Sequence, residues 1–307
     1  MTTSRASRII AGIMITVVLL WIAGWFLSDR FAWSQWLSWI PTLSVSAVLI
    51  AGSGFALAAR QRCWAVLAAV LGVTALGWWA FAENRLFQDR DGAGDVRLVA
   101  WTMSHSKARS REHAEEVIRL DGDITVMTHG YIVRGEPALK EWLGPRGKRL
   151  INGPFTVLTR FRAVEVQTLI ASDGVHLSVF VLGTKKELGR HLVLWAIDLP
   201  SEFNESRIAT ARRVRRILSS IDAPLPDIVV GDFNMERNSA AIKVMFPALT
   251  DAWDEAGSGL SSSYHRVLPL YHIDHMLLGP SVAAVSYRLV NPGIGRHRVQ
   301  VAELVSN

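Results

Sequence analysis

Cysteine is almost absent from this chain, since Cys63 is the single thiol among 307 residues. The part of the chain after Cys63 therefore has no side chain for a disulfide or a zinc–thiolate site. Charge is missing only locally: residues 9–27, 40–59 and 63–82 contain no Asp, Glu, Lys or Arg. Internal repeats and low-complexity tracts are lacking too. Shifts in composition therefore have to mark the boundaries between parts of the chain.

The three uncharged stretches are each long enough to cross about 30 Å of hydrocarbon as a helix. We therefore expect a membrane region over residues 1–84 with three transmembrane helices. The alternative is a cleaved signal peptide followed by two buried helices. It is disfavoured because the first stretch is long and no small-residue cleavage site follows Leu27. Tryptophans lie beside these stretches, where interfacial aromatic belts occur: Trp33, Trp36, Trp39, Trp78 and Trp79.

Arginines indicate how these helices are oriented. Cytoplasmic ends of membrane spans are rich in Lys and Arg. Four arginines precede the first stretch or lie between the second and third: Arg5, Arg8, Arg60 and Arg62. The bias is modest, because three others lie at the opposite ends: Arg30, Arg85 and Arg90. With an odd number of spans, we expect a multi-pass integral membrane protein. Its partner is the lipid bilayer, and its C-terminal part lies outside the cytoplasm.

The C-terminal part has the composition of a folded α/β domain. A polar linker over residues 85–95 precedes a domain over residues 96–307. Helical spacing occurs near residues 110–123, 204–221 and 239–249. Apolar runs predict strands at 96–105, 124–130, 154–161, 164–172, 175–183, 191–200, 227–234, 271–279 and 297–304. Runs of consecutive strands, with few helices between them, predict a two-sheet α/β sandwich.

Charge in this domain gives little information about a partner. The chain has a net charge of +6, which does not by itself argue for nucleic acid. The predicted helix 204–221 contains five arginines: Arg207, Arg212, Arg213, Arg215 and Arg216. They either bind phosphate or face solvent. We favour solvent, because runs of charged residues on helices usually face water. Polar residues gather instead at strand ends: Thr102, His129, Asp198, Asp232, Asn234, Asp274 and His297. If these ends meet, they form a site.

Four motifs, in order, resemble the endonuclease/exonuclease/phosphatase superfamily. They are TVLTRF (156–161), VVGDFN (229–234), YHIDHMLL (271–278) and GRHRVQVAEL (295–304). This superfamily includes pancreatic deoxyribonuclease, abasic-site endonucleases, sphingomyelinases and inositol polyphosphate phosphatases. The similarity covers about residues 96–304. It implies the two-sheet fold and metal-dependent hydrolysis of a phosphoric ester, of phosphodiesterase or phosphatase type.

The resemblance also implies roles for four residues. Asp232 would deprotonate or position the attacking water, and Asn234 would hold that water or the phosphate. Asp274 would help to orient the metal site or the leaving group. His297 would donate to a phosphate oxygen while negative charge builds up in the transition state.

Four other positions depart from the pattern of the superfamily. Thr102 stands where Asn is expected, and His129 stands in place of the metal-binding Glu. Asp198 occupies the position of a His, and Arg296 replaces an Asp that would orient His297. A guanidinium pointing inward at Arg296 would lower the pKa of His297, or it would grip a phosphate.

These replacements affect the choice of metal most. The resemblance implies Mg²⁺ or Mn²⁺, but an imidazole at His129 suits Zn²⁺ better than Mg²⁺. A cluster of His129, Asp198 and Asp232, with His275, would bind such a metal, whereas lone histidines more often only form hydrogen bonds. We therefore expect magnesium-dependent activity to be very low or absent, with Zn²⁺ or no metal as alternatives.

Two functions remain open from the sequence. One is a membrane-anchored phosphoester hydrolase that acts on a lipid headgroup, a nucleotide or a nucleic acid. The other is a non-catalytic descendant that binds a phosphate-bearing ligand or a protein partner. The substrate cannot be read from the fold, because members of one fold differ in their loops.

Overall fold

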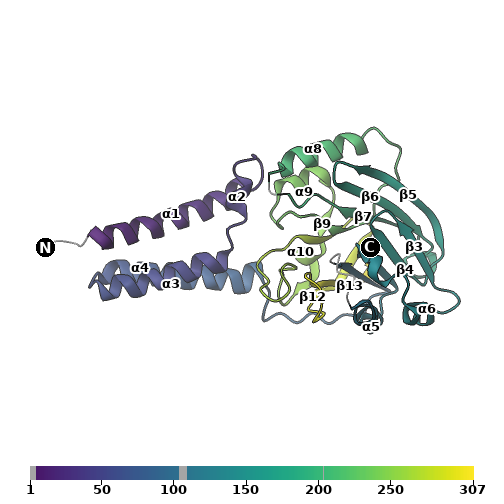
Figure 1. Ribbon diagram of the computed structural model, residues 1–307, viewed down its shortest axis with the longest axis horizontal. Coiled ribbons are helices and arrows are strands. Elements are labelled where there is room, and N and C mark those ends of the chain that lie inside the picture. The colour runs from purple at the N-terminus through teal and green to yellow at the C-terminus, as the bar shows by residue number, and fades with distance from the viewer. Residues whose placement is uncertain (1–4, 104–108, 203) are drawn as a thin grey trace.

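The computed structural model describes residues 5–103, 109–202 and 204–307. Three long helices form a bundle at one end of the molecule, and a two-sheet sandwich forms the other end (Figure 1). The bundle helices are α1 (Arg5–Leu27), α3 (Thr42–Ala58) and α4 (Arg62–Trp78). A short helix α2 (Gln35–Ser38) follows α1, and a π-helical turn η1 (Trp79–Glu83) continues α4. The N-terminus lies at the end of the bundle farthest from the sandwich (Figure 1).

Two helical segments of the described chain are long and apolar enough to cross a membrane. They are Ile9–Leu27 and Arg62–Glu83, with 19 and 22 residues. The apolar helix between them, α3, has 17 residues and is shorter than the expected segment 40–59. Pro41 accounts for its start, because the residue before a proline is disfavoured in helical conformation. Arg60, with a left-handed φ of 59°, follows its end.

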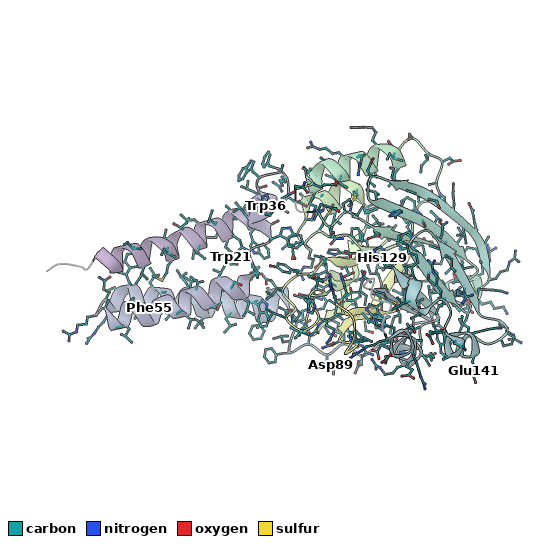
Figure 2. All side chains as sticks on the ribbon, viewed as in Figure 1. Trp21, Trp36, Phe55, Asp89, His129 and Glu141 are labelled. Carbon is teal, nitrogen blue, oxygen red and sulfur yellow. The ribbon has the colours of Figure 1, made fainter. Side chains whose placement is uncertain are left out.

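Most of the bundle surface is apolar and exposed. Its interior is small and is built around Met14, Val45, Leu49 and Ala68. Exposed side chains include Ile9, Ile13, Leu19, Phe26, Phe55, Val66, Val70 and Val73. Figure 2 shows Phe55 toward the far end of the bundle and Trp36 near the sandwich. This exposed apolar surface is continuous and large, whereas soluble proteins usually expose apolar residues singly.

The sandwich consists of two mixed sheets. One has seven strands in the order β10-β12-β13-β1-β2-β4-β3, and the other has six in the order β5-β6-β7-β8-β11-β9. The strand bounds of the first sheet are β1 (Val96–Thr102), β2 (Ile124–Thr128), β3 (Lys148–Asn152), β4 (Phe155–Thr159), β10 (Gly257–Ser258), β12 (Val282–Val290) and β13 (Val299–Ser306). Those of the second are β5 (Ala163–Ser172), β6 (Val175–Leu182), β7 (Leu192–Asp198), β8 (Ile228–Asp232), β9 (Thr250–Asp251) and β11 (Asp274–Leu278).

Helices cover both outer faces of the sandwich. The core between the sheets contains side chains from both, such as Leu98, Phe180 and Met276. The seven-stranded sheet packs on its other face against α5 (Ser110–Leu120), η2 (Gly130–Val133) and α6 (Pro137–Leu143). The six-stranded sheet packs against α8 (Arg207–Leu218) and α9 (Ala240–Met245). Two short helices, α7 (Lys185–Leu188) and α10 (Ala252–Ala256), complete the fold.

The predicted sandwich is present, but four of its strands were not predicted: the two-residue strands β9 and β10, and the longer strands β3 and β12. The edge strand β3 is short and largely exposed, so it has no continuous apolar run. The nine-residue strand β12 has a mixed burial pattern and contains a register shift between Ala284 and Ser286. Within the predicted helix 204–221, Arg207 was expected at the surface. It is instead 3% exposed and donates to the carbonyl of Pro200.

The connection between α1 and α3 is bonded to the sandwich. The carboxylate of Asp29 accepts from the backbone N of Ala241 (3.1 Å), in the first turn of α9. The side chain of Gln35 accepts from the backbone N of Arg207 (3.1 Å), at the start of α8. These bonds satisfy N–H groups that a helix leaves without partners at its N-terminus. The helical bundle and the sandwich are thereby held in one arrangement.

Candidate active site

Strand pairing places the polar strand ends at one edge of the sandwich. Strands β7 and β8 are parallel, and Asp198 is paired with Asp232. Strand β11 runs antiparallel to β8, and its first residue, Asp274, is also paired with Asp232. In the other sheet, β1 and β2 are parallel and end together at Thr102 and Thr128. The next residue after Thr128 is His129.

The Gly-Asp-Phe-Asn corner has backbone requirements of its own. Gly231 has φ 148°, and a Cβ atom there would lie 1.9 Å from the carbonyl oxygen of Ile197. Asn234 has a left-handed φ of 50°, which Asn tolerates better than most residues. Its backbone N donates to Oδ1 of Asp232 (3.1 Å), and its side-chain Nδ2 donates to the carbonyl of Leu199 (2.8 Å). The corner is therefore a hydrogen-bonded turn that also presents a carboxylate.

Asp274 is the centre of a buried polar network. Nδ1 of His297 donates to its Oδ2 (2.8 Å), and the hydroxyl of Thr102 donates to its Oδ1. Its backbone N donates to the hydroxyl of Ser263 (3.1 Å). Asp232 is adjacent: one ligand atom from each of Asp232, Asp274 and His297 lies within 4.8 Å of the others. These side chains are close enough to act on one phosphate.

Burial and neighbouring charges separate the pKa values of the two carboxyl groups. Burial, reinforced by the carboxylate of Asp274, holds the pKa of Asp232 well above its ordinary value. Burial would also raise the pKa of Asp274, but the charge and hydrogen bond of His297 outweigh it and lower that pKa. Two neighbouring carboxyl groups with pKa values pushed apart are typical of acid–base sites.

The pKa of His297 differs from the expectation based on Arg296. Burial disfavours the charged imidazole, but the adjacent carboxylate of Asp274 outweighs it and raises the pKa of His297 to about 9. Arg296 lowers that pKa, but its effect is the smallest of those acting on the ring. The expected effect of Arg296 is thus present, but the net pKa is raised because Asp274 supplies the orienting carboxylate.

His129 and Asp198 face each other across the same cleft. Nε2 of His129 lies 3.1 Å from Oδ2 of Asp198. These two residues come from different sheets, since His129 follows β2 and Asp198 ends β7. The residue types are the reverse of those that the resemblance implies, namely a carboxylate at 129 and an imidazole at 198.

The cleft has a volume of about 780 Å³ and is lined by six of the expected residues: Thr102, His129, Asp198, Asp232, Asn234 and His297. Arg296 also lines it and is exposed. Two neighbours of the site were not predicted from the sequence. The hydroxyl of Ser263 accepts a hydrogen bond from the backbone N of Asp274, and Tyr264 forms a β-bridge with His297. That Trp39 lines the cleft was not predicted either. Trp39 could not be found from motifs, because it belongs to the predicted membrane region.

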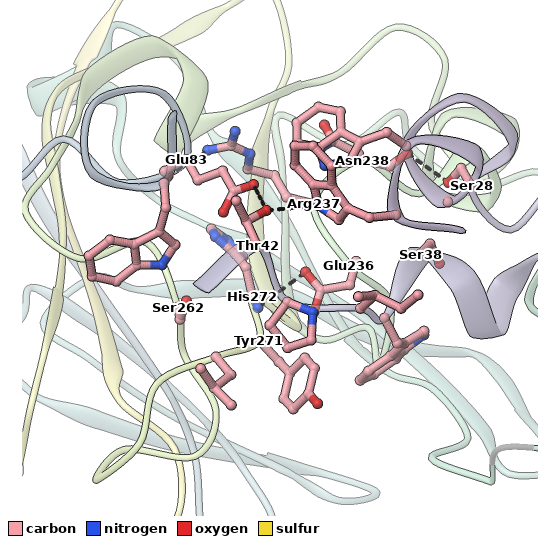
Figure 3. A pocket seen from close by; sticks show the side chains of 18 of the residues that line it. Ser28, Ser38, Thr42, Glu83, Glu236, Arg237, Asn238, Ser262, Tyr271 and His272 are labelled. Carbon is pink, nitrogen blue, oxygen red and sulfur yellow. Dashed lines mark hydrogen bonds between the residues drawn. The ribbon is translucent and has the colours of Figure 1, made fainter. Parts of the chain in front are cut away.

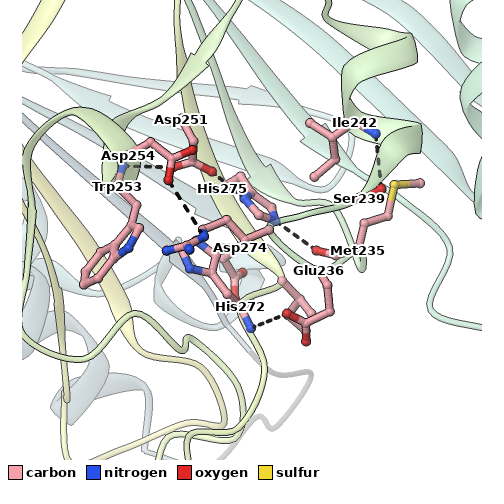
Figure 4. Close-up of polar contacts among 12 residues, drawn as sticks. Met235, Glu236, Ser239, Ile242, Asp251, Trp253, Asp254, His272, Asp274 and His275 are labelled. Atoms are coloured by element: carbon pink, nitrogen blue, oxygen red, sulfur yellow. Dashed lines mark hydrogen bonds and ion pairs between the residues drawn. The ribbon is translucent and has the colours of Figure 1, made fainter. Parts of the chain in front are cut away.

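A second cluster of titratable groups lies outside this cleft (Figure 4). It contains Asp251, His272 and His275. His275 contacts the carboxylate of Asp251 (2.7 Å) and the carbonyl of Met235 (2.9 Å). The expectation that His275 lies beside His129 and Asp198 as a metal ligand is wrong. Successive strand residues point to opposite faces, so the side chain of His275 points away from that of Asp274.

Comparisons with known proteins support the fold. No protein-family model matches the sequence, and no curated protein sequence matches it. Among solved structures, a mannosyl-6-phosphatase from Bacteroides thetaiotaomicron matches with a TM-score of 0.53 and 16% identity, over 68% of this chain and 99% of that one. An endonuclease/exonuclease/phosphatase family protein from the same organism matches with a TM-score of 0.52 and 15% identity, over 68% and 94% of the two chains.

A humanized TDP2 from D. rerio gives a similar result, with a TM-score of 0.51 and 16% identity over 68% of this chain and 98% of that one. At such identities these matches establish the fold alone. The chain has the endonuclease/exonuclease/phosphatase fold.

The cleft residues fit a divalent cation in one respect. Asp232 and Asp274 present two buried carboxyl groups close together, and the raised pKa of Asp232 shows that the surroundings do not fully compensate a second negative charge. A cation would supply that compensation, and carboxylate oxygens suit Mg²⁺ or Mn²⁺. The imidazole of His129 suits Zn²⁺ better.

Proposed function

We propose that this chain is a membrane-anchored phosphoester hydrolase of the endonuclease/exonuclease/phosphatase superfamily, with an altered metal site. The observation that carries this proposal is the buried Asp274–His297 pair beside Asp232, of which His297 and Asp232 line a cleft formed by strand ends. The fold, shared with a phosphatase, supports it. The reaction class follows from these groups, because a cationic donor and a separate carboxyl base suit attack by water on a phosphate ester.

Each proposed catalytic residue has one task. His297, kept cationic by Asp274, donates to a phosphate oxygen as negative charge develops there. Asp232 in its ionised form accepts a proton from the attacking water. The Asn234 amide, held at the carbonyl of Leu199, fixes the corner that positions Asp232. Arg296, exposed at the edge of the cleft, attracts the phosphate.

A divalent cation would be held by Asp232 and the neighbouring carboxylates of Asp198 and Asp274. When bound, it would supply charge stabilisation to the phosphate oxygens. With His129 in contact with Asp198, the set contains an imidazole in place of one oxygen ligand. We therefore propose that magnesium supports the reaction weakly, with manganese or zinc as the better metal.

We also propose that the domain architecture is a membrane region over residues 1–84, a linker over 85–95 and a catalytic domain over 96–307. Helix α3 spans the bilayer together with α1 and α4, because its 17 residues reach the lower end of the range for spans, about 17–25. Both apolar segments on either side of α3 end at the sandwich, where Ser28 contacts Asn238 and Glu83 contacts Arg237, so two such spans require the chain to return across the bilayer along α3.

The proposed orientation places the sandwich outside the cytoplasm. At the sandwich end, Arg85 donates to the carbonyl of Trp253 (2.9 Å) and Arg90 to that of Glu255 (2.5 Å). Because these two arginines form hydrogen bonds within the protein, they are weaker indicators of membrane orientation than the arginines at the opposite end of the helices. A reporter that functions only outside the cytoplasm, fused after Asn307, is expected to be active. Activity of a cytoplasm-only reporter at the same position would contradict this orientation.

The proposed catalysis is tested with the purified full chain in detergent. We expect hydrolysis of a nitrophenyl phosphate monoester or diester in the presence of Mn²⁺ or Zn²⁺. The Asp232→Asn variant should be slower by about 10²- to 10⁴-fold, the usual contribution of a positioned acid or base. A matched control is Asp173→Asn, since Asp173 is exposed and pairs with Arg213 on the surface. Equal rates for the unmodified chain and Asp232→Asn would contradict the proposal.

The second candidate function is a non-catalytic protein that binds a phosphate-bearing ligand or a protein partner. The reversed pair at His129 and Asp198 favours it, because an imidazole in place of an oxygen ligand weakens a magnesium site. Under this function, phosphate stabilises the chain against heat and Arg296→Ala removes the effect, while no ester is hydrolysed with any metal.

A further inference from the structure

Trp39 lines the cleft and lies in the connection between α2 and α3. Its ring packs against Tyr271 with the ring centroids 5.2 Å apart. It also lies three residues before Thr42, the first residue of the apolar helix α3. If α3 crosses the bilayer, the cleft opens at the level where α3 leaves it.

The distance between the cleft and the bilayer is fixed by polar contacts. Figure 3 shows a cavity of about 90 Å³ where the bundle meets the sandwich. Beside this cavity, the hydroxyl of Thr42 donates to the carboxylate of Glu83, and Arg237 donates to the carbonyl of Glu83 (3.2 Å). Together with the hydrogen bonds of Asp29 and Gln35 described above, these bonds attach to the sandwich both the segment that follows α1 and the segment that follows α4. The cleft cannot swing away from the membrane without breaking these contacts.

Two segments beside the junction of the bundle and the sandwich carry exposed apolar residues. In the connection between α1 and α2, Phe31 and Trp33 are 51% and 61% exposed. On the sandwich, the loop from Tyr264 to Tyr271 carries Val267 and Leu268, which are 67% and 62% exposed. Tyr264 lines the cleft, and Tyr271 contacts Trp39. Tyr264 and Tyr271 pair as a β-bridge, so the loop projects from beside the cleft and Trp39 with an apolar tip, as a segment in contact with lipid would.

We propose that the substrate is a phosphate ester carried on a membrane lipid. Its headgroup enters the cleft past Trp39, while its acyl chains remain in the bilayer beside α3 and the 264–271 loop. This inference rests on the proposed hydrolase function and names its substrate class. A water-soluble ester would gain nothing from an apolar edge of the cleft or from a fixed height above the membrane.

The reaction is a hydrolysis with water as the only co-reactant. The oxygen of water forms a new bond to phosphorus, and the ester P–O bond breaks. Asp232 accepts the proton of the attacking water and later releases it to solvent, and the departing alkoxide takes a proton from solvent to become an alcohol. A phosphomonoester leaves a diacylglycerol-type alcohol in the bilayer. A phosphodiester leaves a phosphomonoester on one product.

The test uses the full chain reconstituted in phosphatidylcholine vesicles. Vesicles contain phosphatidic acid, phosphatidylglycerol or phosphatidylinositol. The soluble counterparts are glycerol phosphate, glycerophosphoglycerol and glycerophosphoinositol, at the same bulk phosphate concentration. We expect at least one lipid to be hydrolysed about tenfold faster than its soluble counterpart, because a shared membrane raises the effective concentration. At fixed bulk concentration, dilution of that lipid in the vesicle surface should lower the rate.

Trp39 is tested with a matched pair of variants. Trp39→Ala should lower the ratio of the vesicle rate to the soluble rate by about fivefold, the effect of losing one aromatic contact. Trp33→Ala removes an exposed tryptophan of the same connection that does not line the cleft, and the ratio should not change. Trp39→Phe keeps an aromatic ring and should keep the ratio, which separates loss of contact from misfolding.

The outcomes separate this inference from the proposed function. Equal or faster hydrolysis of the soluble esters, with no effect of Trp39→Ala on the ratio, overturns the lipid substrate and leaves the hydrolase function standing. Absence of hydrolysis in both arms overturns both. Faster hydrolysis in vesicles with equal losses in Trp39→Ala and Trp33→Ala contradicts entry past Trp39.

Discussion

Replacing Asp274 by asparagine is expected to slow phosphate ester hydrolysis by about 10²-fold or more and to move the alkaline limit of activity to lower pH. The carboxylate of Asp274 accepts from Nδ1 of His297 (2.8 Å) and is the main group that raises the pKa of this histidine to about 9. A cationic His297 is present below that pKa and is lost as the pH rises through it. Without the carboxylate, burial and Arg296 both lower the pKa of His297.

The measurement is the pH profile of kcat/KM for the full chain and for Asp274→Asn. An NMR titration of the His297 ring gives the same shift independently of turnover. Thr102→Val is the matched control, because it removes a hydrogen bond to the same carboxylate but keeps its charge. That variant should be slower without a comparable shift of the alkaline limit. An unchanged limit in Asp274→Asn would show that Asp274 does not determine the charge of His297.

The fold could be predicted from the sequence largely because its strands carry strong local signals. Strands such as β7 and β8 are buried along their whole length and therefore appear as continuous apolar runs. The strand β12 lacks such a run because it alternates between buried and exposed positions around a bulge. The end of α3 depended on the conformation of Arg60, which composition does not specify.

The polar residues of the cleft could be predicted because strand ends in one sheet share an edge. Asp232 and Asp274 are partners in the β8–β11 register, so a motif at each strand end was enough to place them together. The partner of His297 was harder to predict. Sequence proximity favoured Arg296, whereas the ring is bonded to Asp274 on a different strand. The contribution of Trp39 depends on docking between two parts of the chain, which no local pattern encodes.

The contact between His129 and Asp198 changes how the four departures from the superfamily pattern are understood. Considered one at a time, His129 replaces an expected carboxylate, and Asp198 replaces an expected imidazole. The structure places the two side chains 3.1 Å apart, so the cleft still contains one imidazole and one carboxylate. The net change is an exchange of position between the ends of β2 and β7. In the site that we propose, the difference from the superfamily pattern therefore lies in the placement of an oxygen ligand and not in the charge.

Exchanging these two side chains, as His129→Glu combined with Asp198→His, is expected to raise magnesium-dependent hydrolysis by about 10²-fold, within the range usual for one positioned group. The double variant preserves the charge of the pair and its close contact, so it should fold as the unmodified chain does. It places an oxygen ligand at position 129, and Mg²⁺ prefers oxygen ligands.

The two single variants should not show this gain. His129→Glu alone places two carboxylates against each other, and like charges at contact range favour binding of a proton over ionisation of both. Asp198→His alone leaves two imidazoles and removes the carboxylate. The double variant should therefore exceed either single variant by more than additivity allows. If the unmodified chain already turns over rapidly with magnesium and the double variant slows it, the reversed pair is a working metal site rather than a weakened one.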